Sequence, residues 1–128
     1  MEEYKHYFLV DGVKVHWNFK LLPDGFEAIT LFGHVYDVQN KEHLRKFLES
    51  YSGKVMVNHE RIHILQAESF KLKYFTFYII YLAWWIKGLF KYKFVNFDAY
   101  NMIPFEREAY SNERDFNYNK VNWKKYKW

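Results

Sequence analysis

The chain has 128 residues, of which 50% are hydrophobic, 27% are charged and 23% are aromatic. This length and composition predict one domain over residues 1–128 and exclude a wholly disordered chain. The net charge of +4 is too small to indicate a nucleic-acid-binding protein. Because the chain has no cysteine, it forms no disulfide or thiolate zinc site, and any metal site must use histidine and carboxylate side chains. The acidic first residues lack the apolar run of a secretory signal, so we expect a cytoplasmic protein.

Strand patterns come first along the chain. Residues 7–10 and 13–17 flank Asp11-Gly12, a dipeptide typical of tight turns, and the second segment alternates apolar and polar residues. This arrangement predicts a β-hairpin. Residues 27–32 are rich in β-branched and aromatic residues and predict a further strand, which can resume at residues 34–36.

Helical patterns follow the strands. The spacing of apolar residues predicts four helices, at residues 41–51, 54–69, 73–90 and 104–119. Strands followed by helices are typical of α+β folds. We therefore expect a small N-terminal antiparallel sheet with helices packed on one face.

The second predicted helix contains the sequence His59-Glu60-Arg61-Ile62-His63, which matches the H-E-x-x-H pattern of zinc hydrolases. Residues four apart lie on one helical face, so both imidazoles can reach one ion. Glu60 can act as the general base on a zinc-activated water. The alternative is a pair of helical histidines beside an exposed Glu-Arg pair, with no metal.

A catalytic zinc usually has a third protein ligand. The H-x-x-G-x-x-H extension is absent, because Gln66 and Ser69 occupy the positions of its glycine and third histidine. The candidates are Glu106 and Glu108, in the first turns of the fourth predicted helix. The apolar stripe of that helix favours Glu108, while the alternative assigns both carboxylates to the helix dipole alone. Asn112, one turn after Glu108, is a candidate supporting amide.

Residues 59–66 and 104–110, with the patterns H-E-x-x-H-x-x-Q and P-F-E-R-E-A, resemble a group of small uncharacterised bacterial proteins. These in turn are similar to gluzincin zinc metallopeptidases, especially the minigluzincin-like ones of about this size. The resemblance covers residues 55–118 and implies a zincin-like fold, a peptide or protein substrate and Glu106 as the third zinc ligand. It also implies that the strand near residues 28–32 binds an extended peptide. Tyr110 departs from the family pattern, which has an aspartate there that orients a ligand histidine.

Residues 74–86 contain only one polar side chain, Thr76, and lysines lie on both sides. A helix that is apolar all round is either buried or in contact with lipid. The segment therefore predicts a core helix, which a homodimer partner can also cover, or attachment to the inner surface of the membrane. The basic, aromatic residues 117–128 are compatible with stacking on nucleic acid, a partner that we do not expect. The alternative to a metallohydrolase is a non-catalytic zinc-binding or membrane-surface protein with a vestigial zincin site.

Overall fold

The computed structural model describes residues 1–92 and 96–127. The chain divides into two compact units, residues 1–61 and residues 62–128. Helix α2 (Tyr51–Glu68) contains the boundary between them. The expectation of one domain over residues 1–128 stays a prediction.

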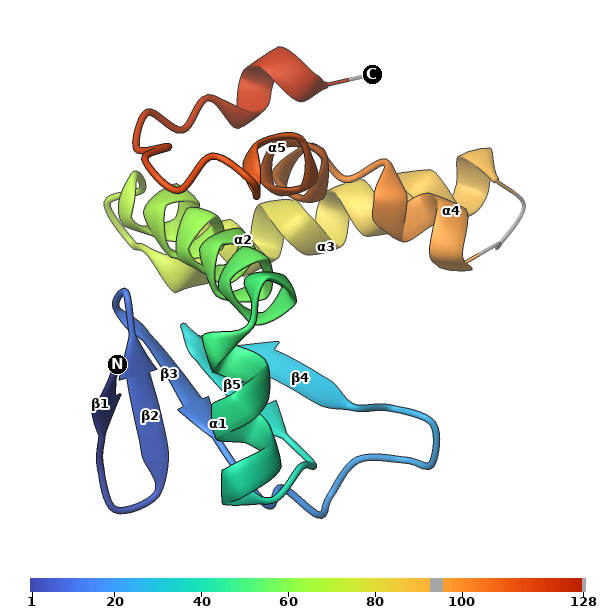
Figure 1. The fold of residues 1–128 in the computed structure, drawn as a ribbon. Helices are drawn as coiled ribbons and strands as arrows, with labels where there is room; N and C mark the ends of the chain where they lie inside the picture. Colours follow the sequence, from blue (N-terminus) through green and yellow to red (C-terminus); the bar gives the residue numbers. More distant parts are fainter. Residues whose placement is uncertain (93–95, 128) are drawn as a thin grey trace. The chain divides into compact units, whose positions relative to one another are not determined.

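The first unit is built on a five-stranded sheet with the strand order β1-β2-β3-β5-β4 (Figure 1). Its strands are β1 (Glu2–Glu3), β2 (Tyr7–Val10), β3 (Val13–His16), β4 (Ala28–Leu31) and β5 (His34–Asp37). Asp11 and Gly12 have positive φ values in the predicted hairpin turn between β2 and β3. The α+β prediction is confirmed, and β4 lies at an edge of the sheet.

One pairing differs from a purely antiparallel sheet, because β3 and β5 run parallel. A hairpin joins β4 to β5, and β5 rather than β4 pairs with β3. Val35 and Asp37 of β5 are buried, whereas most of β4 is exposed. The more buried strand therefore takes the central position, and the connection before β4 allows the parallel pairing.

Helix α1 (Lys41–Glu49) contacts the first strands of the sheet. Asn40 caps it, since its side-chain oxygen accepts a hydrogen bond from the backbone nitrogen of His43 at 2.9 Å. Arg45 lies over the Phe8 ring and forms an ion pair with Glu3. Buried apolar side chains fill this unit, among them Phe8, Val13, Val15, Val35, Leu44 and Leu48.

The second unit contains the remaining helices, α3 (Tyr74–Lys91), α4 (Asn96–Asn101) and α5 (Pro104–Asn112), and the short 3₁₀ helix η1 (Trp123–Tyr126). Ala67, Phe77, Ile103 and Phe105 form the centre of its core. Gly88 of α3 allows a close approach to α4, because a Cβ atom at Gly88 would lie 2.9 Å from the Cα atom of Ala99. The sequence patterns did not predict β1, α4 or η1.

The fourth predicted helix is shorter than expected, since α5 ends at Asn112 rather than near residue 119. The Asn112 side chain donates a hydrogen bond to the backbone oxygen of Glu108 at 2.8 Å, an interaction that competes with the helical pattern. The chain then turns, so that Tyr118 and Asn122 reach the Glu108 carboxylate. Phe116, within the predicted range of this helix, lies beyond its end and is 45% exposed.

None of the helices in the described part of the chain combines the length and hydropathy that crossing a membrane requires.

Candidate metal centre

Helix α2 carries both histidines of the H-E-x-x-H pattern, and α5 carries Glu106. His59, His63 and Glu106 each offer one ligand atom, and these atoms all lie within 4.8 Å of one another. His59 and Glu106 are buried, and the His63 side chain is 13% exposed. The three side chains can therefore hold a metal ion, whose identity the donor set alone does not fix.

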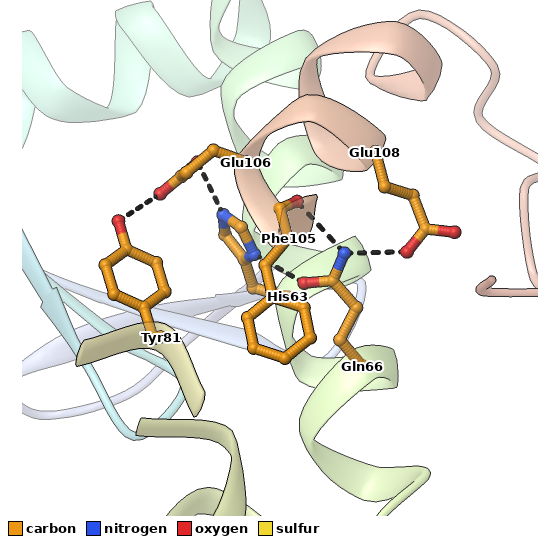
Figure 2. A network of polar contacts seen from close by, with 6 residues as sticks. All are labelled: His63, Gln66, Tyr81, Phe105, Glu106 and Glu108. Atoms are coloured by element: carbon orange, nitrogen blue, oxygen red, sulfur yellow. Dashed lines mark hydrogen bonds and ion pairs between the residues drawn. The ribbon is translucent and has the colours of Figure 1, made fainter. Parts of the chain in front are cut away.

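The start of α5 positions Glu106. Pro104 occupies the first helical turn after the extended Ile103, a place where proline costs the helix no hydrogen bond. The buried Phe105 ring stacks on Phe77, with the ring centroids 4.6 Å apart. Because Phe105 is held in the core, the next side chain along α5 points to His63, as Figure 2 shows.

Gln66, one turn after His63 on α2, orients the His63 ring. Its amide nitrogen donates to the backbone oxygen of Phe105 at 3.0 Å and to Oε1 of Glu108 at 2.7 Å. The amide oxygen is then left to face Nδ1 of His63 at 2.8 Å. Since that oxygen can only accept, Nδ1 carries the proton and Nε2 of the neutral ring offers a lone pair.

Glu108 holds Gln66 in this orientation. The Glu108 side chain is fully buried, and its carboxylate accepts hydrogen bonds from the Gln66 amide, the Tyr118 hydroxyl at 2.7 Å and the backbone nitrogen of Asn122. A buried carboxylate needs such donors to offset its lost hydration. Residues after α5 thus complete the surroundings of Glu108, which supports His63 through Gln66.

Two tyrosines lie near the Glu106 carboxylate. The Tyr81 hydroxyl donates to Oε2 of Glu106 at 2.6 Å, and Tyr100 lies close enough for the charge of Glu106 to affect its pKa. Burial, followed by the charge of Glu106, raises the pKa of both tyrosines well above the ordinary value. Both phenols therefore stay protonated donors at neutral pH. With Oε2 engaged by Tyr81, Oε1 is the oxygen that faces His63 (Figure 2).

The contact between His63 and Glu106 tests whether a metal ion fits. Nε2 of His63 lies 2.9 Å from Oε1 of Glu106. When the His63 ring is neutral and its proton is on Nδ1, facing Gln66, Nε2 of His63 and Oε1 of Glu106 can both only accept. Their close contact therefore requires a proton or a cation between them. Two ligands of a tetrahedral zinc lie about 3.3 Å apart, given bonds of about 2.0–2.1 Å. A divalent cation thus fits with a small opening of this contact.

Other predicted residues lie around the triad. Glu60 is partly buried on α2 beside His59. Glu108 faces Gln66 rather than His63, so the structure does not bring it into the triad. Tyr110 is 49% exposed. Asn112 binds the backbone oxygen of Glu108 and the hydroxyl of Tyr126, and so supports α5.

The sequence patterns did not predict the roles of Gln66 and Tyr81. Gln66 follows His63 by three residues on a predicted helix, and this spacing could have predicted the contact between their side chains. Tyr81 is one of 12 tyrosines, and no pattern distinguishes it.

Comparisons with known proteins place the chain in no family. No protein-family model, no curated protein and no solved structure matches the chain. The resemblance to gluzincins therefore rests on the two motifs and stays a prediction.

Proposed function

We propose that the chain is a zinc-dependent hydrolase, and that its substrate is a peptide or protein. The observation that carries the proposal is the convergence of His59, His63 and Glu106 in a largely buried cluster, with Glu60 next to His59 on the same helix. Two histidines and a glutamate are the zinc donors of several metallopeptidases. A peptide or protein substrate is what the resemblance of residues 59–66 and 104–110 to the gluzincin motifs implies.

In this proposal each side chain has one role. His59, His63 and Glu106 bind zinc, while Gln66 keeps the Nδ1 proton of His63 in place so that Nε2 is the ligand atom. Zinc, when bound, supplies a Lewis acid that lowers the pKa of a water molecule. The Glu60 carboxylate accepts the proton of the attacking water and passes it to the leaving amine.

The test compares Glu60→Gln with the unaltered chain on a library of quenched fluorescent peptides. We expect zinc content to stay the same and hydrolysis to fall by about 10²–10⁴-fold, the usual contribution of a general base. Glu68→Gln is the matched control, since Glu68 is an exposed residue of the same helix. Zinc-dependent cleavage that is undiminished in Glu60→Gln would rule out this mechanism.

A second candidate is a zinc site that stabilises the fold without catalysis. The observation that favours it is burial, because His59 is only 7% exposed and Glu106 only 3%. Structural zinc sites are closed to solvent, whereas catalytic sites keep an open position. This candidate predicts that a chelator lowers the Tm while no peptide is cleaved. A cleaved product that disappears on chelation would reject it.

A further inference from the structure

Helix α3 has two faces of different character, and one of them is apolar and exposed. On its buried face, Phe77 and Gly88 pack inside the second unit. On the other face, the large apolar side chains are between 43% and 70% exposed, and they are Phe75, Ile79, Leu82, Ile86 and Phe90. We call these five residues the α3 stripe.

The α3 stripe is continuous along the helix. At 3.6 residues per turn its five residues fall within an arc of about 80°, and they extend for about 22 Å along the axis. Leu72, just before the helix, is 62% exposed. Single exposed apolar residues are ordinary on a protein surface, but a continuous row marks an interaction site.

The charges beside the stripe indicate the kind of partner. Lys71, Lys73, Lys87 and Lys91 are exposed near the two ends of α3. No Asp or Glu occurs in the sequence between Glu68 and Asp98. The segment is therefore purely basic and complements an anionic surface.

We infer that the α3 stripe docks this protein on an anionic phospholipid surface, with α3 lying in the plane of the interface. Apolar residues on one side of a helix enter the boundary of the acyl chains, while lysine side chains reach the headgroups. No helix of the described residues, α3 included, is both long and apolar enough to cross a bilayer. A helix with one apolar side and nearby lysines can instead lie along the surface. The inference does not depend on the proposed hydrolase activity.

A second copy of the chain is a less suitable occupant. In a two-fold symmetric dimer the same surface packs against itself. The stripe of one copy would then bring its lysines close to those of the other copy, with no acidic residue on the segment to compensate. Anionic lipid headgroups neutralise these lysines instead.

The test is sedimentation of the full chain with phosphatidylcholine vesicles that contain or lack phosphatidylglycerol. We expect binding only to the anionic vesicles, and weaker binding at high salt because screening reduces the attraction. The double variant Ile79→Ser and Leu82→Ser should bind at least 10-fold less. The matched control is Leu21→Ser and Phe26→Ser, which removes two apolar side chains that are 84% and 61% exposed in the first unit.

Circular dichroism establishes that each variant is folded. Should the stripe variant fail to fold, Lys87→Gln with Lys91→Gln provides a second test, and it should weaken binding to anionic vesicles while keeping the helix content. A chain that stays in the supernatant with anionic vesicles at low salt overturns the inference. Self-association in solution that the stripe variant abolishes would also overturn it, because a second copy would then occupy the stripe.

Discussion

The two glutamates of α5 lie in different surroundings although only one residue separates them. On one side of the helix, Glu106 has one oxygen engaged by Tyr81 and the other directed at His63. On the other side, Glu108 is saturated by donors from Gln66, Tyr118 and the backbone of Asn122. A carboxylate with an oxygen facing a histidine suits metal binding, and a saturated one suits the orientation of a neighbour. The comparison shows that hydrogen-bond partners, rather than position on the helix, distinguish the two roles.

The largest effect is expected where the proposed ligand itself is changed. Glu106→Gln should lower zinc affinity by more than about 100-fold, because it loses a charged ligand and not merely a supporting contact. Glu108→Gln should lower the affinity by about 10–100-fold at most. Glu108→Gln should also lower the free energy of unfolding by about 1–3 kcal/mol, since the buried donors that face Glu108 lose a charged acceptor.

Elemental mass spectrometry and competition with a chelator measure the zinc affinity of these two variants, with His59→Ala as the reference for a lost ligand. If Glu108→Gln abolished zinc binding and Glu106→Gln retained it, Glu108 would be the third ligand and the comparison would be reversed.

The next largest effect is expected at the link between Glu108 and His63. Gln66→Glu places a second carboxylate beside Glu108 and removes the donating amide. We expect a loss of about 10–100-fold in zinc affinity and of about 1–3 kcal/mol in stability. Nitrogen NMR of the His63 ring should show that the preference for a proton on Nδ1 is reduced. Gln39→Glu is the control of equal charge, and an unchanged His63 spectrum in Gln66→Glu would show that Gln66 does not orient the ring.

A smaller difference is expected between the tyrosines that hold the two glutamates. Tyr81→Phe and Tyr118→Phe each remove one hydrogen bond, so each should cost about 0.5–1.5 kcal/mol in stability. Tyr81→Phe should also lower zinc affinity by about 10-fold, whereas Tyr118 acts through Glu108 and Gln66 and should matter less. Chemical denaturation and chelator competition measure both quantities. Equal losses of affinity in the two variants would contradict the separation of roles.

The smallest effect near neutral pH is expected from the tyrosines' own titration. Burial raises the pKa of Tyr74 to about 12 and raises that of Tyr118 above its ordinary value. Their protonated forms therefore favour the folded state, and this stability is fully present below about pH 10, the ordinary tyrosine value. As the pH rises through 10 toward 12, the unfolded chain releases these protons first, and stability falls.

Thermal unfolding between neutral and alkaline pH measures this effect. Tyr74 and Tyr118 should leave the Tm unchanged up to about pH 10, and their ionisation should lower the Tm above that pH. A Tm that rose above pH 10 would contradict the raised pKa values. Ultraviolet absorbance of tyrosinate in the folded chain provides a direct check.

The sequence predicted the α+β class, because alternation and helical spacing are local properties. It also narrowed the candidate site to His59, His63 and two glutamates. The apolar stripe favoured Glu108 and the resemblance favoured Glu106, and spacing alone could not decide, since the surroundings of the two carboxylates depend on contacts with Gln66 and Tyr81 from other helices. The early end of α5 has the same cause, because residues after Asn112 bend toward Glu108. The parallel pairing of β3 with β5 likewise depends on which strand is more buried.

The contacts of the candidate site join distant parts of the chain, which has a consequence for the order of folding. His63 and Glu106 are 43 residues apart, and Gln66 and Glu108 are 42 apart. Closing such loops costs conformational entropy that only the final packing recovers, so contacts of this kind form late. During synthesis, the histidine pair exists before the carboxylate has been added. We therefore expect metal capture by the triad to follow the docking of α5 and to report on completed folding of the second unit.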